Sequence, residues 1–322
     1  MIGARKSKRF IGVRLFSGIA LSVASSILHP GTAVGIEPQQ STAKKSSSSD
    51  VPIVKEIAYL PADRIEKGDL YLPPESKGDD AKEREAAERR PAILIIHGGG
   101  WVGGKRDAAR EINIGTTCAL EGYVCLSIDY MLHDPKSEKP CWPQNLYDCK
   151  TAVRWLRANA EKYRIDPERI GVIGGSAGGH LAAMVGVTGP ECGLDPAGPY
   201  GEFPCSVRCV VDLYGPVDVT DRDDVSALRA KRADAPELYK SFSVQTYLDP
   251  KDPPVLILHG TADKTVPVEQ STRFAEALAK AGIEHQLEII EGAPHTFHLQ
   301  PKQKDLRPLV LGFFNKHLRW ER

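Results

Sequence analysis

A single serine among four glycines, between a strand pattern and a helix pattern, constrains this chain more than any other feature. The stretch RIGVIGGSAGGHLAAM covers Arg169–Met184. The apolar run before the glycines predicts a buried strand, and the run after them predicts a helix. Gly174 and Gly178 stand two residues on either side of Ser176, where neighbouring chains approach too closely for side chains. The pattern predicts a sharp turn that lifts the Ser176 hydroxyl above the strand end.

The rest of the chain alternates in the same way from residue 51 onward. Several strand patterns are apolar throughout, which is typical of parallel strands covered by helices on both faces. The expected fold class is therefore α/β, with a mostly parallel central sheet of about eight strands. Strands are predicted at 54–60, 68–74, 92–96, 123–130, 169–175, 208–216, 253–260 and 285–292, and helices at 109–122, 145–163, 177–187, 268–282 and 306–318.

The glycine-serine turn has two candidate uses, binding phosphate or presenting a nucleophile. No lysine follows at phosphate-loop spacing, whereas G-x-S-x-G between strand and helix matches a nucleophile elbow. A serine needs a base, and the base needs an orienting acid; in this motif they follow in the order acid, then histidine. Asp263 lies just beyond a predicted strand, and His295 lies in the loop after the next strand. Both belong to the same sheet edge as Ser176, so the three are predicted to converge.

Other residues could compete for these roles. His298 is close to His295 but is expected to lie at a helix start or to face solvent. Asp249 and Asp252 come before their strand and so belong to the opposite edge of the sheet. Two further histidines are expected to be structural: His180 and His259.

A second glycine-rich loop, HGGGWVGG, follows the strand at 92–96. Glycines let the backbone itself approach a reacting carbonyl, so the loop is predicted to supply N–H groups to an oxyanion. We expect three aromatic residues to line a shallow substrate pocket near Ser176: Trp101, Trp142 and Tyr214.

The motifs HGGGW, GGSAGGH, HGTAD and PHTF, in this order, resemble α/β-hydrolases of the hormone-sensitive-lipase and bacterial acetyl-esterase group. The resemblance extends over residues 91–318 and implies a serine carboxylesterase with an α/β-hydrolase fold. It also implies that the oxyanion donors are the N–H groups of Gly99, Gly100 and Ala177, and that His97 holds the glycine loop in shape. The chain departs from the group in two respects. Residues 51–90 are too short and too charged for a large helical cap, and PHTF replaces the frequent GHGF.

The expected reaction is two-step acyl transfer, with Ser176, His295 and Asp263 as a triad and with no cofactor. The expected substrates are short acyl esters, acetyl above all, of small molecules or carbohydrates such as acetylated polysaccharides. Two alternatives share the fold: a peptidase of the prolyl-oligopeptidase type and a non-catalytic binding module. The peptidase normally carries a β-propeller, and the chain has no repeat of blade length.

The amino-terminal residues predict export rather than fold. A basic stretch, a short apolar run and small residues make residues 1–36 a predicted signal peptide, which implies a periplasmic or extracellular location and no stable membrane insertion. The alternative is an uncleaved anchor, but the apolar run is shorter than the roughly 20 residues that a membrane-spanning helix needs. Residues 37–50 are polar and serine-rich, as in a flexible linker, and residues 51–322 form the predicted catalytic domain. Formal net charge is zero, which gives no reason to expect a nucleic-acid partner.

The chain has seven cysteines, an odd number, so at least one must be free. None has metal-site spacing, and no metal is predicted. Cys192 and Cys205 flank a loop rich in glycine and proline, and they are the predicted disulfide if an oxidising compartment allows one.

Overall fold

A computed structural model describes residues 51–75, 89–195 and 198–319, which belong to one compact unit. The predicted signal peptide and linker, residues 1–50, lie outside the described residues. Within the described ranges, no helix combines the length and apolar character needed to cross a bilayer.

Among the described residues, eight strands form one sheet in the order β1-β2-β4-β3-β5-β6-β7-β8. The first two strands pair antiparallel, and every pair from β4 through β3 to β8 is parallel. This arrangement confirms the predicted mostly parallel sheet of about eight strands. The strands are β1 Ile53–Ile57, β2 Gly68–Tyr71, β3 Arg90–Ile96, β4 Val124–Ile128, β5 Ile165–Gly175, β6 Val210–Leu213, β7 Val255–Gly260 and β8 His285–Ile290.

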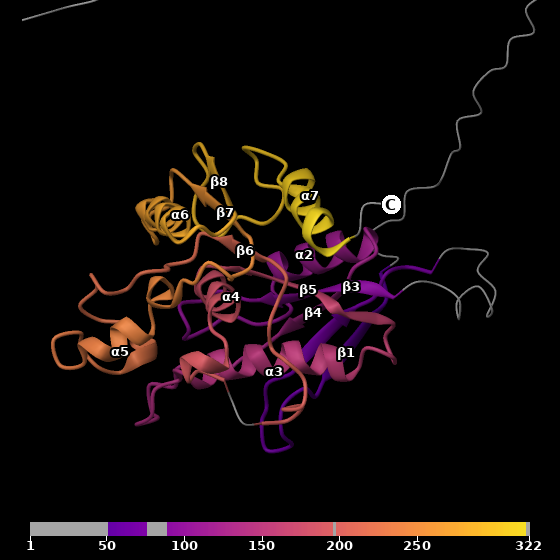
Figure 1. The fold of residues 1–322 in the computed structure, drawn as a ribbon, viewed down its shortest axis with the longest axis horizontal. Helices are drawn as coiled ribbons and strands as arrows, with labels where there is room; N and C mark the ends of the chain where they lie inside the picture. The colour runs from indigo at the N-terminus through magenta and orange to yellow at the C-terminus, as the bar shows by residue number, and fades with distance from the viewer. Residues whose placement is uncertain (1–50, 76–88, 196–197, 320–322) are drawn as a thin grey trace, which may run out of the picture. The chain divides into compact units, whose positions relative to one another are not determined.

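Helices cover both faces of the sheet, as the apolar strands predict (Figure 1). Successive residues of a strand point to opposite faces, and β3 shows the consequence. Leu94 and Ile96 pack in one apolar cluster with α3, α4 and α6, whereas Ile93 and Ile95 pack in another with α2 and α7. The principal helices are α2 Ala109–Leu120, α3 Gln144–Ala158, α4 Ala177–Val187, α6 Glu269–Ala281 and α7 Arg307–Leu318.

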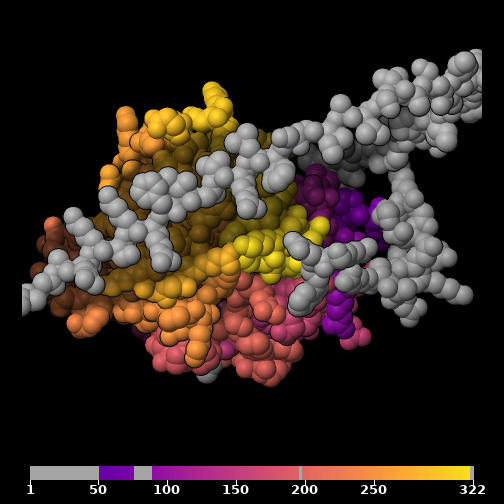
Figure 2. Space-filling model, turned by 45° about the horizontal axis from the view of Figure 1, so that its top comes forward, coloured from indigo at the N-terminus to yellow at the C-terminus, as the bar shows by residue number. Residues whose placement is uncertain are grey.

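Most predicted boundaries differ from the structure by three residues or fewer, and two differ by more. The strand that leads to Ser176 begins at Ile165 rather than at residue 169, because its first residues continue the pairing with β3. Helix α3 ends at Ala158, five residues before the predicted end. Figure 2 shows part of the C-terminal segment, in yellow, at the molecular surface, in agreement with the mixture of exposed and buried residues along α7.

The polar segment at 218–240 contains two short helical turns, η3 Ser226–Leu228 and α5 Pro236–Ser241. It follows the carboxyl end of β6, and Arg229 Nη1 donates to the carbonyl oxygens of Asp134 and Pro135 in the loop after β4. The segment therefore lies along the edge of the sheet at which the parallel strands end. Its apolar side chains are buried in the core: Val219, Val225, Leu228 and Tyr239.

Candidate active site

Ser176 lies in the tight turn between β5 and α4, with φ 57° and ψ −123°. Its backbone N–H donates to the Leu213 carbonyl oxygen at 2.8 Å, which attaches the turn to β6. A Cβ on Gly174 would overlap the backbone of Gly178, and one on Gly178 would overlap the Ile96 carbonyl oxygen. The two glycines are therefore required by the close approach of α4 to β5 and to the end of β3. Such strained non-glycine backbone is concentrated at functional sites.

Two loops from neighbouring strands bring a histidine and an aspartate to this serine. His295 follows β8, and its Nε2 lies 3.0 Å from Ser176 Oγ. Asp263 follows β7, and its Oδ2 lies 2.5 Å from His295 Nδ1. The three side chains thus form one hydrogen-bonded chain above the carboxyl ends of β5, β7 and β8. With Nδ1–H donated to the carboxylate, His295 Nε2 is left to accept the hydroxyl proton.

Asp263 is held in its charged form. Burial opposes ionisation, but hydrogen bonds from His295 and from the backbone N–H groups of Val266 and Thr265 outweigh it and lower the Asp263 pKa below its ordinary value. The two backbone groups donate to Oδ1 at 2.9 and 2.8 Å, which leaves Oδ2 for the histidine. A fixed anion in this position can hold the His295 tautomer and stabilise the imidazolium that forms when His295 takes a proton.

His259 supports Asp263 in a way that the strand pattern alone does not indicate. Its Nε2 lies 3.0 Å from the Val266 carbonyl oxygen and 3.2 Å from Asp263 Oδ2, so this nitrogen carries the proton. Its Nδ1 then accepts from the Ser271 hydroxyl at 2.7 Å. Burial lowers the His259 pKa, which favours this neutral form. The sequence feature that could have indicated this contact is the spacing of four residues between His259 and Asp263 in the motif HGTAD.

The glycine loop after β3 lies against the serine turn. A Cβ on Gly98 would come within 2.6 Å of the Gly175 carbonyl oxygen and 3.2 Å of Ser176 Cβ. His97 stacks on Tyr130 with ring centroids 4.3 Å apart, and its Nδ1 donates to the Gly98 carbonyl oxygen at 2.7 Å. His97 therefore contacts the glycine loop, which the family resemblance predicts it to hold in shape. Gly99 and Gly100 are exposed at the loop tip, and Ala177 is the first residue of α4.

Two of the predicted pocket aromatics form part of a buried ring cluster. Trp101 meets His180 and Phe242 edge-on, with centroids 5.3 and 5.1 Å apart, and Trp142 meets Phe242 at 4.8 Å. Their exposed fractions are only 6% and 4%. His180 Nε2 donates to the Phe242 carbonyl oxygen at 2.7 Å, and burial lowers the His180 pKa to about 4, as expected of a structural histidine.

Tyr214 is a correction to the predicted substrate pocket. Its exposed fraction is 0%, so it offers no surface to a substrate. The ring lies edge-on beside the His295 ring with centroids 4.7 Å apart, and the hydroxyl is bonded within the protein. The residue follows β6 directly, which turns it into the apolar layer beneath the site rather than toward solvent.

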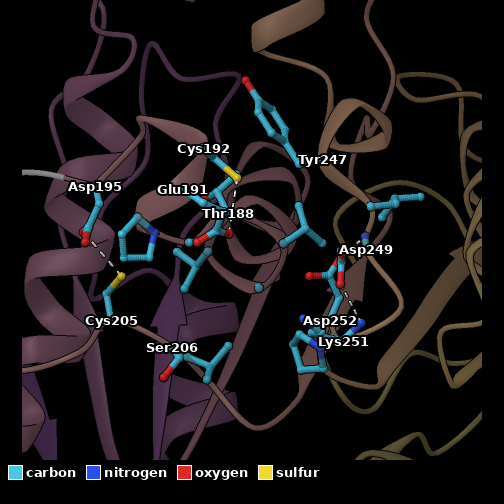
Figure 3. A pocket seen from close by; sticks show the side chains of 18 of the residues that line it. Thr188, Glu191, Cys192, Asp195, Cys205, Ser206, Tyr247, Asp249, Lys251 and Asp252 are labelled. Carbon is cyan, nitrogen blue, oxygen red and sulfur yellow. Dashed lines mark hydrogen bonds between the residues drawn. The ribbon is translucent and has the colours of Figure 1, made fainter.

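The competing residues lie elsewhere. His298 is exposed, and its Nδ1 accepts from the Gln300 N–H at 3.0 Å. Asp249 and Asp252 line a cavity of about 930 Å³ (Figure 3). The cavity also touches Pro254, just before β7, and the end of α4, so it lies at the amino edge of the sheet, opposite Ser176.

The same cavity holds the predicted disulfide cysteines, and the structure contradicts that pairing. All seven cysteines are free thiols. Cys205 Sγ lies 3.4 Å from Asp195 Oδ1 and Cys192 Sγ lies 3.6 Å from Glu191 Oε1, so each thiol has a carboxylate partner instead (Figure 3). Flanking the same loop did not bring the two sulfurs together. Across the described residues, no group of three or more His, Cys, Asp or Glu side chains could hold a metal ion.

Comparison with known proteins agrees with this geometry. The sequence profile of the BD-FAE family matches residues 69–278. Two esterases of Mycobacterium tuberculosis are similar: LipQ is 28% identical over 87% of this chain and 70% of its own length, and LipC is 35% identical over 65% of this chain. The chain spans about half the length of LipC, with 53% of that protein aligned.

A solved structure described as a truncated form of a carbohydrate esterase from gut microbiota is similar over nearly its whole length. It superimposes with a TM-score of 0.72 and 26% sequence identity, covering 85% of this chain and 99% of the other. The sheet order, the helices on both faces and these relatives identify the α/β-hydrolase fold that the motifs predict.

Proposed function

This chain is a carboxylic ester hydrolase of the BD-FAE family, and we propose that it is a serine esterase that removes short acyl groups, acetyl above all, from carbohydrates. The observation that carries the proposal is the continuous hydrogen-bonded chain from Ser176 through His295 to Asp263. A serine becomes an effective nucleophile only when a positioned base accepts its proton, and this chain supplies both the base and its orienting acid.

The reaction proceeds in two acyl transfers. His295 Nε2 takes the Ser176 proton as Oγ attacks the ester carbonyl, and Asp263 stabilises the resulting imidazolium. His295 then gives the proton to the departing alcohol oxygen, which leaves an acyl group on Ser176. A water molecule enters and attacks the acyl carbonyl while His295 takes its proton. His295 then returns that proton to Ser176 Oγ as the bond between Oγ and the acyl carbon breaks, which releases the carboxylic acid and restores the enzyme.

The tetrahedral oxyanion is stabilised by the glycine loop and the start of α4. Gly98 packs against the serine turn, and Gly99 and Gly100 follow it directly in the same loop, which supports assigning their N–H groups to the oxyanion. Ala177 is in the first turn of α4, where N–H groups have no partner within the helix and the helix dipole favours negative charge. We assign the three N–H groups to the oxyanion; one such donor typically contributes about 3–4 kcal/mol to transition-state stabilisation.

Two observations support a short acyl group on a carbohydrate. The segment 218–240 beside the site turns its apolar side chains inward and its charges outward, which leaves little apolar wall for a long acyl chain. The solved relative at 99% coverage is described as a carbohydrate esterase.

We also propose export, on the basis of the signal-peptide pattern at 1–36. Amino-terminal sequencing of secreted protein would detect cleavage near residues 33–36, and an intact terminus would contradict the proposal.

The proposal is tested by replacing the nucleophile. Ser176→Ala should lower the rate of p-nitrophenyl acetate hydrolysis by about 10⁴- to 10⁶-fold while leaving the thermal unfolding midpoint near that of the wild type. Acetate release from acetylated xylan should fall in parallel, and a prolyl-peptide anilide should not be cleaved by either protein. Near-wild-type turnover by Ser176→Ala would contradict the assignment of Ser176 as the nucleophile. Cleavage of the anilide but not the esters would favour a peptidase.

A further inference from the structure

A largely buried arginine lies beneath three of the four loops of the candidate site: the serine turn, the glycine loop and the His295 loop. Arg110 is the second residue of α2, and its side chain is 13% exposed. A methyl group placed on Gly175 would come within 2.7 Å of Arg110 Nη1, and one on Gly98 would come within 3.1 Å of Nη2. The guanidinium therefore lies directly against the serine turn and against the glycine loop.

The same guanidinium reaches the histidine loop through one tyrosine. Arg110 Nη1 donates to the Tyr214 hydroxyl oxygen at 2.8 Å. Because that oxygen accepts from a group that can only donate, the Tyr214 proton is free to point to the Phe297 carbonyl oxygen, 2.8 Å away. Phe297 is two residues beyond His295, and the Tyr214 ring packs edge-on beside the His295 ring at 4.7 Å.

The charge of the arginine is compensated locally. Arg110 Nε and Nη2 donate to one oxygen of Glu111, at 2.9 and 2.5 Å, and the Glu111 side chain is 1% exposed. A buried ion pair of this kind fixes geometry strongly, because moving either member would leave an uncompensated charge. Arg110 is thus a fixed point from which Tyr214 can hold the loop that carries His295.

We propose that Tyr214 and Arg110 form a positioning pair that holds the His295 loop in register with Ser176, an inference that rests on the proposed esterase function. Neither residue touches the reacting atoms. Tyr214 restrains the imidazole through its ring and through the Phe297 carbonyl, and Arg110 orients the Tyr214 hydroxyl. Without the pair, His295 spends less time within hydrogen-bond distance of both Ser176 and Asp263, so the chemical step slows.

The test compares Tyr214→Phe with a matched tyrosine. Tyr214→Phe keeps the ring and loses only the hydroxyl, so kcat should fall about three- to tenfold with KM within twofold. Tyr123→Phe is the control: Tyr123 is equally buried in the same apolar cluster, and its hydroxyl donates to Asn315 Oδ1 at 2.6 Å, but it lies at the amino end of β4. This control should lose thermal stability similarly and keep its kcat.

A spectroscopic readout separates positioning from general stability. The low-field proton resonance of the His295–Asp263 hydrogen bond should broaden and exchange faster with water in Tyr214→Phe and should be unchanged in Tyr123→Phe. A double-mutant cycle with Arg110→Lys, which keeps the charge beside Glu111, tests whether Arg110 acts on His295 through Tyr214. If Arg110 acts through Tyr214, the second substitution should cost little kcat once the first is present.

The outcomes distinguish this inference from the function on which it rests. If the wild type hydrolysed no ester, or if Ser176→Ala were fully active, the esterase proposal would fail. If those two proteins behaved as expected while Tyr214→Phe kept the wild-type kcat and resonance, the positioning role would be wrong. Fully additive effects of Arg110→Lys and Tyr214→Phe would overturn the path through Tyr214.

Discussion

At the residue scale, the site distinguishes two histidines that stand three positions apart in one loop. His295 connects a serine and an aspartate, whereas His298 is exposed and accepts only from the backbone of Gln300 among the contacts described. Identical side chains therefore have different chemistry, because one is enclosed by partners from β5 and β7 and the other faces water. The difference is a property of partners and not of residue type.

Replacing each histidine by alanine should separate these roles. His295→Ala removes the base, and because triad members act as a unit, kcat should fall about as far as in Ser176→Ala. His298→Ala removes one exposed contact and should change kcat by about twofold or less. Steady-state hydrolysis of p-nitrophenyl acetate measures both. The reverse ranking would assign the base to His298 and would make the 3.0 Å contact to Ser176 irrelevant to turnover.

At the element scale, the site depends on how closely one helix approaches two strands. Helix α4 starts immediately after the serine turn, and its second residue, Gly178, must pass the end of β3 without a side chain. The same closeness places the first turn of α4 beside the glycine loop. Packing of α4, rather than the serine alone, therefore determines where the N–H of Ala177 lies.

Gly178→Ala tests that dependence. The added methyl group would overlap the Ile96 carbonyl oxygen, so α4 and β3 must move apart, at a cost of about 1–3 kcal/mol of unfolding free energy. Activity should fall as well, since the turn moves with the helix. Gly312→Ala in α7 is the control, because a Cβ there meets nothing within 4 Å, and it should stabilise by about 0.5–1 kcal/mol. Urea unfolding would measure both; equal stability changes would contradict the close-approach argument.

At the scale of the whole molecule, the chain between β6 and β7 determines what lies next to the site. Residues 218–240 bury their apolar side chains in the main core and leave acidic and basic groups at the surface, such as Asp221, Asp223 and Arg229. A long acyl chain gains about 0.8 kcal/mol per buried methylene only where a continuous apolar wall receives it. This segment offers no such wall.

The specificity constant should therefore be highest for acetyl to butyryl esters and should decline beyond about six carbons. A p-nitrophenyl ester series from two to sixteen carbons, assayed below the solubility limit of each ester, measures the profile. As carbon number rises, the decline should appear in kcat/KM rather than in the unfolding midpoint. A maximum at ten carbons or more would reveal an apolar acyl site and would make the protein a lipase.

Much of the fold and of the candidate site could be predicted from the sequence. The spacing of apolar residues and the positions of glycines indicate the strands, helices and turns, and the topology of a parallel sheet indicates which loops share one edge. Apolar runs and their spacing predict the strands and helices, and the glycines around Ser176 predict the turn. The carboxyl ends of parallel strands share one edge, so Asp263 and His295 could be placed beside Ser176 although each is distant in sequence. The structure brings all three together.

Only the tertiary structure decided which side chains surround this chain of hydrogen bonds. Tyr214 follows a strand at the correct edge, yet it is buried under His295, and its partner Arg110 lies 104 positions away. Cys192 and Cys205 flank one loop and could have formed a disulfide, yet each thiol donates a hydrogen bond to a carboxylate instead. Such contacts depend on the packing of distant segments, and no local pattern encodes the direction in which a side chain turns once the strands and helices are assembled.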